Sequence, residues 1–169
     1  DSTVQYAREH PLTAMAEEEN WLALLPFGQH GATWWDEVGM TSAPVRGHEG
    51  RATMSWDEKR WNVDLRDTVK RYIALRKDHP ALRRGAFVPL YSDDPTNVYA
   101  FVRRLASESL VVVLNNGEQA YELCVPVKGE LADGVEFKDL LGSGRYVVRD
   151  GTVTGTSISS RSGVVLQAL

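Results

Sequence analysis

The spacing of apolar residues changes near Gly85. Before that glycine, apolar residues recur every three or four positions over long stretches, which is the period of one face of a helix. After it, apolar and polar residues alternate in short runs, which is the period of a strand with one buried face. We therefore expect two domains, residues 1–85 with helices and residues 86–169 with strands.

Eight short apolar runs follow Gly85, and residues typical of tight turns separate them, for example Asn115-Asn116-Gly117 and Asp150-Gly151. Strands with this spacing and these hairpin signals predict an antiparallel β-sandwich with a Greek-key path. The expected strands are Ala86–Leu90, Val98–Leu105, Leu110–Leu114, Tyr121–Val127, Val135–Leu141, Tyr146–Arg149, Thr152–Ile158 and Val164–Leu169.

The first half of the chain alternates helix and strand. A helix that begins near Thr13 and ends at Pro26 precedes a strand candidate at Ala32–Trp35, and a second helix follows a loop from Val38 to Asn62. Helix, strand, loop and helix in this order are typical of a parallel α/β architecture. One strand and two helices cannot bury their own apolar faces, so we expect this part to need more sheet than the sequence supplies.

The second helix has clear start and stop signals. Asp64 is the expected N-cap. The residues on one side of the helix are Leu65, Val69, Tyr72, Ile73 and Arg76. The pair His79-Pro80 ends the helix, since proline cannot continue the hydrogen-bond ladder, and Ala81–Arg84 is expected to form a separate short turn closed by Gly85.

Composition and charge argue against two classes of partner. The chain has 169 residues, of which 43% are apolar and 25% charged, as in ordinary globular domains. A net charge of -4, with no basic stripe, argues against nucleic acid. No apolar run reaches the roughly 18 residues that a membrane-spanning helix needs. The sequence assigns the protein to no cellular compartment.

The sequence shows no motif for a metal or a cofactor. The four histidines lack metal-ligand spacing, and Gly142-Ser143-Gly144 separates two strands instead of opening a helix, as a phosphate loop would. The single Cys124 lies in an apolar run, so we expect a buried structural thiol. We therefore expect no metal and no cofactor.

The loop from Val38 to Asn62 is the first candidate for a binding surface. Loops longer than about 12–15 residues are uncommon in compact domains and are often functional. This one contains Arg51, Trp56 and Trp61, and an indole ring can stack on a sugar while a guanidinium donates hydrogen bonds to hydroxyls. The alternative is that the tryptophans only pack one domain against the other and that Arg51 forms a salt bridge within the loop.

Adjacent carboxylates occur at three places, and none predicts a catalytic pair. Asp36-Glu37 follows a strand, where successive side chains point to opposite faces. Asp57-Glu58 opens a helical turn, and Asp93-Asp94 lies in a hairpin turn. We expect all three pairs to be structural or solvated, so no catalytic residue is assigned to this chain.

Three motifs, in this order, carry a resemblance to a known family. They are Asp36-Glu37-Val38-Gly39-Met40, then Arg51-Ala52-Thr53-Met54-Ser55-Trp56, then the segment from Tyr72 to Gly85 with its Leu75-Arg76 and His79-Pro80-Ala81-Leu82-Arg83. Further matches are 98–103, 110–116 and Asp139-Leu140-Leu141. From about Leu22 to Leu169 the chain resembles the C-terminal third of the α-amylase family of glycoside hydrolases, near the neopullulanase, maltogenic amylase and trehalose synthase branches.

The resemblance implies a fold and a site. Residues 1–85 would supply helix 7, strand 8 (Ala32–Trp35), the long loop and helix 8 (Asp64–Lys77) of a (β/α)8 TIM barrel, followed by a C-terminal β-sandwich. The catalytic carboxylates of the family would lie before Asp1, so the chain alone would be inactive and its partner would be the upstream barrel portion. The loop would border the cleft for an α-glucan oligosaccharide. The implied substrate-binding residues are Arg51, Trp56, Trp61 and Glu37.

Two alternatives stay open. A trehalose-synthase-like isomerase would use the same double displacement and keep the sugar. A non-catalytic carbohydrate-binding or assembly module would need an exposed aromatic platform on the strands, for which the candidates are Tyr91, Tyr99, Tyr121 and Tyr146. The first residue, Asp1, is not Met, which suggests an excised or processed piece of a longer polypeptide.

Overall fold

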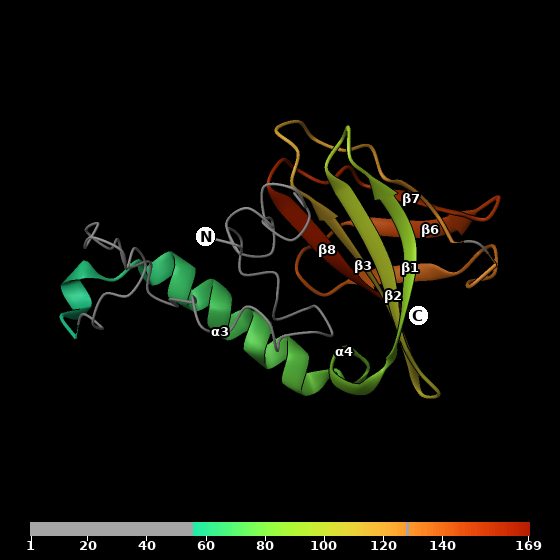
Figure 1. Cartoon of the computed structure of the whole chain (residues 1–169). Coiled ribbons are helices and arrows are strands. Elements are labelled where there is room, and N and C mark those ends of the chain that lie inside the picture. The colour runs from blue at the N-terminus through green and yellow to red at the C-terminus, as the bar shows by residue number, and fades with distance from the viewer. Residues whose placement is uncertain (1–55, 128) are drawn as a thin grey trace, which may run out of the picture.

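A computed structural model describes residues 56–127 and 129–169 of the chain (Figure 1). The helices are the 3-10 helix η2 (Glu58–Arg60), α3 (Val63–Asp78) and α4 (Pro80–Arg84). The strands are β1 (Ala86–Asp93), β2 (Val98–Leu105), β3 (Glu108–Asn115), β4 (Cys124–Pro126), β5 (Glu136–Asp139), β6 (Arg145–Arg149), β7 (Thr152–Gly155) and β8 (Ser162–Ala168). The predicted helix from Thr13, the strand Ala32–Trp35 and most of the long loop lie outside the described residues.

Helix α3 begins two residues earlier than its sequence signals suggest. Asn62 is the N-cap, and its side-chain oxygen accepts a hydrogen bond from the Leu65 backbone N–H at 3.0 Å. The prediction of Asp64 as the cap is therefore wrong. Asn62 and Asp64 both have a side-chain oxygen that can accept such a bond. Asn62 has the extended backbone of an N-cap, which places its side-chain oxygen near the Leu65 N–H. Asp64 lies in the first turn, where the helix dipole favours a negative charge.

The buried face of α3 differs from the predicted one at Ile73 and Leu75, while the other predicted residues are buried or partly buried. Tyr72 is buried as expected, but its buried neighbour is Leu75, whereas Ile73 is 44% exposed. Tyr72 and Leu75 are three residues apart and so share a face of the helix, which is the face turned to the sheet. His79 ends the helix, and α4 with its C-cap Gly85 forms the predicted separate turn.

The prediction of eight antiparallel strands is confirmed. Their hydrogen-bonded order is β1-β2-β3-β8-β5-β6-β7-β4, and every pair is antiparallel. β5, β6 and β7 follow one another, and β4 lies beside β7 after a long connection, which is the order of a Greek key. The strands form one continuous sheet and not the two separate sheets that a sandwich implies, because β8 pairs with β3 on one side and with β5 on the other.

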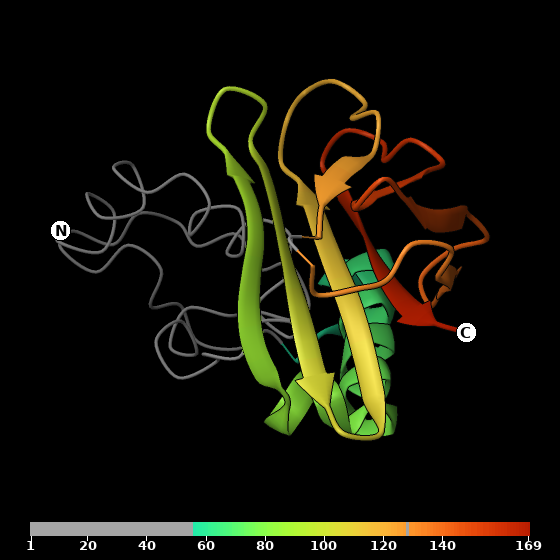
Figure 2. The same cartoon turned by 90° about the vertical axis from the view of Figure 1, so that its right-hand side faces the viewer.

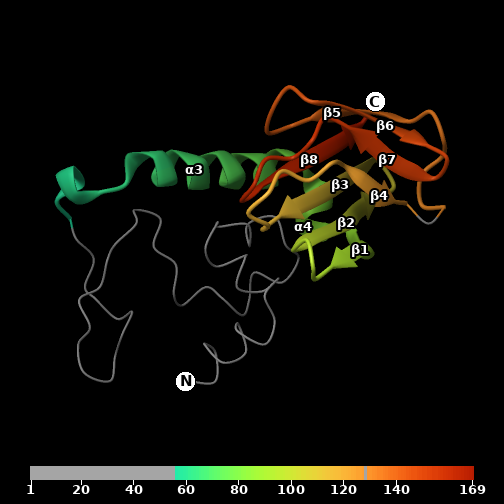
Figure 3. The ribbon, with the colours of Figure 1, turned by 90° about the horizontal axis from the view of Figure 1, so that it is seen from above.

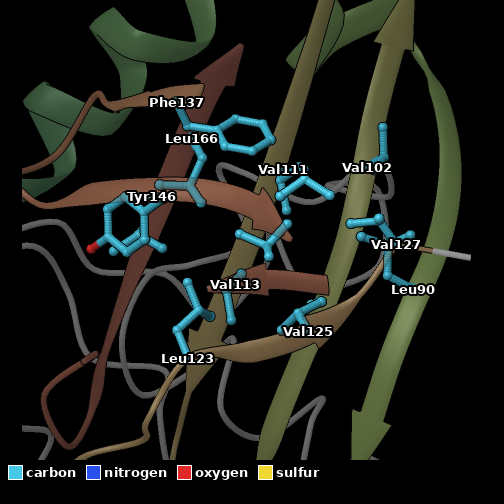
Figure 4. Close-up of a cluster of buried hydrophobic side chains, with 14 of the residues drawn as sticks. Leu90, Val102, Val111, Val113, Leu123, Val125, Val127, Phe137, Tyr146 and Leu166 are labelled. Atoms are coloured by element: carbon cyan, nitrogen blue, oxygen red, sulfur yellow. The ribbon is translucent and has the colours of Figure 1, made fainter. Parts of the chain in front are cut away.

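The sheet curls around one apolar interior to which all eight strands contribute (Figures 2 and 4). Side chains labelled in Figure 4, among them Val111, Val125, Phe137 and Tyr146, point toward one another from both sides of the curl. Alternate residues of each strand supply this interior, as the period of two requires. The fold of residues 86–169 therefore follows from burial of one side of a single sheet.

The outer face of β2, β3 and β8 carries a second apolar cluster. It contains Phe101, Leu110, Val112 and Val165 from the strands and is covered by the helices. The helical residues in it are Tyr72, Leu75, Ala81 and Leu82. Seen from above, α3 runs away from this cluster, so η2 lies beyond the sheet (Figure 3). Only one end of α3 is therefore packed on the strands.

Cys124 is exposed, which overturns the expectation of a buried thiol. It lies on β4, the last strand in the sheet order, where Val125 points into the interior and its two neighbours do not. The apolar run around Cys124 is thus an alternating edge strand and not a strand buried on both faces.

Among the described helices, none combines the length and the apolar character that a bilayer crossing requires.

We expect Leu82→Ala to lower the free energy of unfolding by about 2–5 kcal/mol, because Leu82 is fully buried between α4 and the sheet and the truncation leaves a cavity. Urea unfolding of the 169-residue chain measures this value. Leu169→Ala is the control, since Leu169 is 81% exposed. Equal stability of the two variants would show that α4 is not part of the folded unit.

Candidate functional site

The turn that contains Trp56 and Trp61 is the described part of the predicted binding loop. Trp56 is 81% exposed and directly precedes η2. The carboxylate of Asp57 accepts a hydrogen bond from the Lys59 backbone N–H at 3.2 Å, and the Trp61 N–H donates to the Glu58 carbonyl at 3.2 Å. Asp57-Glu58 is therefore a structural pair that opens a helical turn, as the sequence predicts.

The two tryptophans have different surroundings. The guanidinium of Arg66 lies over the Trp61 ring, 5.0 Å from its centroid, in cation–π geometry. Arg66 is in the first turn of α3, so this contact joins the turn to the helix. One face of Trp61 is thereby occupied, whereas Trp56 is the more exposed ring. Of the two, Trp56 is better placed to stack on a ligand.

The other two predicted binding residues, Glu37 and Arg51, lie outside the described residues. Neither Trp56 nor Trp61 belongs to the side-chain clusters that pack against the sheet. Within the described range, the structure thus places the two tryptophans on one short turn at the start of α3.

The opposite end of α3 is fastened to the sheet by Glu108. One carboxylate oxygen of Glu108, at the start of β3, lies 2.5 Å from Nδ1 of His79, and the other accepts a hydrogen bond from the Ala81 backbone N–H at 3.0 Å. Both side chains of the pair are mostly shielded from water. We call these contacts, together with those of Arg103 and Arg76 below, the α3–α4 joint.

Two arginines complete the joint. Arg103, on β2, is 2% exposed and donates from Nε to the Ala81 carbonyl at 3.1 Å and from Nη2 to the Leu82 carbonyl at 3.3 Å. Arg76 donates to the same Leu82 carbonyl at 2.6 Å. Burial, and then the charge of Arg76, lower the pKa of Arg103 from its ordinary value. The carbonyl ends of α4 offset the cost of this buried cation.

Gly85 lets the chain leave the joint and enter β1. A side chain at this position would place its Cβ 2.5 Å from the Ala81 carbonyl oxygen and 3.0 Å from the backbone of Arg104. The close approach of α4 to β2 therefore requires a residue without Cβ.

The turn Asp139-Leu140-Leu141 contacts α3 from another strand. The Asp139 carboxylate accepts a hydrogen bond from the Leu141 N–H at 2.9 Å, which shapes the turn, and the Leu140 N–H donates to the Val165 carbonyl at 2.8 Å. The guanidinium of Arg71, on α3, donates to the Leu141 carbonyl. The turn thus ties the middle of α3 to the sheet.

The sequence signals assigned no role to Glu108 and Arg103. A charged residue within an apolar run, as Arg103 stands between Val102 and Leu105, indicates a buried charge that needs a partner. Its acceptors lie more than twenty residues earlier and could not be named without the fold.

The four tyrosine candidates for a sugar platform are dispersed. Tyr146 is buried, and Tyr99 packs on Phe101 with ring centroids 5.7 Å apart. Tyr91 and Tyr121 lie together, 6.5 Å between centroids, and Tyr121 donates to the Cys124 carbonyl at 3.2 Å. Burial and the hydrogen bond with Tyr91 raise the pKa of Tyr121 well above its ordinary value. Tyr91, Tyr121 and Tyr146 pack against the interior and Tyr99 against the outer cluster, so these four rings form no broad exposed platform.

No three His, Cys, Asp or Glu side chains gather as metal ligands would in the portion of the chain that is described.

Comparison with known proteins identifies relatives of this chain. The family model "Neopullulanase-like, C-terminal domain" matches residues 87–167. The cyclomaltodextrinase of Geobacillus thermopakistaniensis is 33% identical over 118 residues, covering 70% of this chain and 19% of that enzyme. Neopullulanase 2 of Thermoactinomyces vulgaris is 40% identical over 96 residues, covering 56% of this chain and 16% of that enzyme.

A solved structure extends the similarity to most of the chain. The crystal structure of Ttha1563 from Thermus thermophilus is 30% identical with a TM-score of 0.71, and the match covers 92% of this chain and 31% of that one. The present chain spans no more than about a fifth of the length of the two enzymes named above.

We expect the His79–Glu108 contact to contribute a coupling energy of about 1–2 kcal/mol, because a largely buried charge-assisted hydrogen bond is lost with either partner. A double-mutant cycle with His79→Ala and Glu108→Ala, read by urea unfolding at neutral pH, measures it. The matched control is the cycle for Lys70 and Asp67, which lie 3.6 Å apart with both side chains more than half exposed. Indistinguishable coupling in the two cycles would contradict a stabilising joint.

Proposed function

The chain belongs to the α-amylase family of glycoside hydrolases, with a neopullulanase-like C-terminal domain at residues 87–167, and we propose that it is the C-terminal portion of a retaining α-glucan-active enzyme. In this proposal residues 1–85 supply the last unit of a (β/α)8 barrel and residues 86–169 the accessory β domain. The chain closes the barrel and borders the substrate cleft. Its partner is the upstream barrel portion of the same enzyme.

The placement of α3 is the observation that supports this proposal most strongly. In a (β/α)8 barrel each strand runs into a loop at the catalytic face, and the following helix begins at that face and ends at the opposite one. The Trp56–Trp61 turn directly precedes α3, while the joint holds the end of α3 on the sheet. The turn then belongs to the catalytic face, and the β domain attaches at the far end of the helix.

The length of α3 separates these two ends. A helix of 16 residues spans about 24 Å at 1.5 Å per residue. The Glu108 contacts, the Arg103 contacts and the Arg71 contact all act on the second half of α3 or on α4. We infer that the β domain buttresses the last barrel helix and so steadies the turn at its other end without touching substrate.

Trp56 is the residue we assign to substrate contact. Its ring is exposed, and the Asp57 cap fixes the turn on which it stands. A broad apolar ring face packs on the C–H face of a glucose unit while the sugar hydroxyls stay hydrated. Trp61 would position the turn through Arg66. Arg51 and Glu37 are proposed as further contacts from the same loop.

The catalytic step itself would use carboxylates from the upstream portion. Retaining hydrolysis needs a nucleophilic carboxylate and a protonated carboxylic acid about 5–5.5 Å apart on either side of one glycosidic bond. The described acid pairs are engaged otherwise, since Asp57 caps η2 and Asp93 accepts a hydrogen bond from the Thr96 hydroxyl. Glu108 is bonded to His79 and Ala81.

We expect the purified 169-residue chain to hydrolyse neither maltoheptaose nor pullulan, and co-expression with the upstream portion of its enzyme to restore hydrolysis. Reducing-sugar release measures both. Turnover by the purified chain would contradict the proposal. A reconstituted enzyme that converts maltose to trehalose without releasing glucose would instead support the isomerase.

We expect Trp56→Ala in the reconstituted enzyme to raise KM for maltoheptaose roughly two- to tenfold, because an aromatic stacking contact is worth about 0.5–1.5 kcal/mol. Trp56→Phe is the matched control and should stay close to the unsubstituted enzyme, since it keeps a ring face. Steady-state kinetics separate KM from kcat. An unchanged KM in Trp56→Ala would remove Trp56 from the substrate contacts.

A further inference from the structure

Asn116-Gly117 is the single place in the sequence where asparagine precedes glycine. In such a pair the glycine backbone nitrogen can attack Cγ of the asparagine side chain, because no Cβ on the glycine hinders it. A C–N bond forms, ammonia leaves, and a five-membered succinimide results. Water then opens the ring to aspartate or isoaspartate, so the reaction needs no other reactant.

In the folded chain, the backbone nitrogen of Gly117, which would attack, is held in a hydrogen bond. The Gly117 N–H donates to Oδ1 of Asn115 at 2.9 Å. Asn115 is 1% exposed, and its amide nitrogen donates to the carbonyls of Gln119 at 2.9 Å and Ser159 at 2.9 Å. The acceptor that holds Gly117 is therefore itself held by two loops.

The side-chain amide of Asn116, which would be attacked, is also held in a hydrogen bond. Nη1 of Arg161 donates to Oδ1 of Asn116 at 2.7 Å. The Asn116 N–H donates to the Asn97 carbonyl at 2.9 Å, and the Arg161 N–H donates to the Gly117 carbonyl at 3.2 Å. The backbone is also tightly packed here, since a Cβ on Gly117 would lie 2.6 Å from the Thr96 carbonyl oxygen. Rotation of the Asn116–Gly117 peptide toward the side chain would break these contacts.

We propose that Asn116 is a latent deamidation site, which the fold keeps closed through Asn115 and Arg161 and which reacts when the β3–β4 turn opens. Asn116 is partly exposed, so in this proposal the hydrogen bonds, and not complete burial, keep the amide from reacting. The reaction rate then reports the fraction of molecules in which this turn is open.

The products would differ in their fit to the turn. Aspartate at position 116 keeps the backbone and places a carboxylate beside the Arg161 guanidinium, which is a favourable pair. Isoaspartate adds one carbon to the main chain between the positions held by Asn97 and Arg161. The isoaspartate form therefore cannot restore all of these bonds.

Mass spectrometry of peptides, with assay of isoaspartate at residue 116, tests the proposal on the 169-residue chain kept at mildly alkaline pH. We expect deamidation in the folded chain to be at least about tenfold slower than in the same chain unfolded in urea, because it waits for local opening. Equal rates in the folded and the unfolded chain would overturn the proposal.

A pair of variants tests the role of Arg161. Arg161 has a φ of 49°, which glycine adopts readily, so Arg161→Gly removes the guanidinium without backbone strain. We expect faster deamidation of Asn116 in folded Arg161→Gly than in the unsubstituted chain. The control is Glu118→Ala, which removes a carboxylate 4.0 Å from Arg161 but no contact of Asn116. An accelerated control with an unchanged Arg161→Gly would contradict the assignment.

Hydrogen exchange of the Gly117 amide, followed by NMR in the unsubstituted chain, keeps the proposal testable if Arg161→Gly does not fold. Strong protection of this amide is expected from its bond to Asn115. Exchange at the rate of an unprotected amide would refute the proposed closure.

Discussion

The carboxylate of Glu108 is the contact on which the arrangement of the described elements depends. It binds His79, where α3 ends, and the Ala81 N–H, where α4 begins, so one strand residue holds both helices. Removing a carboxylate from water is costly unless charge-assisted partners replace the water, and these two contacts do so. Pro80 enforces the bend between the helices, and Arg103 secures the carbonyls of α4 from the neighbouring strand. Together with the contact of Arg71 near the middle of α3, these few atoms at its C-terminal end fix the direction of the helix.

The apolar clusters explain why this joint forms at β2 and β3. Leu110 and Val112 face the helices, while Val111 and Val113 face the interior of the curled sheet, so the middle strands are buried on both sides. Glu108 and Arg103 lie on the same face of these strands as Leu110 and Val112, where the helices shield their polar contacts from water and so strengthen their hydrogen bonds. The β domain can then act as a rigid base for α3, which is the role that the proposed function gives it.

Two of the segments that carry the resemblance to glycoside hydrolases have structural roles in the described part of the chain. The segment from His79 to Gly85 forms the joint, and Asp139-Leu140-Leu141 forms the turn that binds Arg71. The family model itself matches residues 87–167, which lie after both of the helices that the joint holds. This agrees with the similarity to cyclomaltodextrinase and neopullulanase 2, whose matched parts are less than a fifth of each enzyme.

Local signals were enough to specify the elements of the described residues: the helix ended by His79-Pro80, the short turn to Gly85, the eight strands and the helical turn opened by Asp57 are all present there. They also singled out the tryptophan turn, although Glu37 and Arg51 remain predictions. Four features required the folded arrangement: that Leu75 and not Ile73 is buried on α3, that Cys124 faces outward, that β8 joins the strands into one sheet, and that Glu108 and Arg103 hold the joint. The physical reason is range: caps, proline and alternation act over a few residues, whereas the partner of a buried charge is chosen by contacts between segments far apart in the chain.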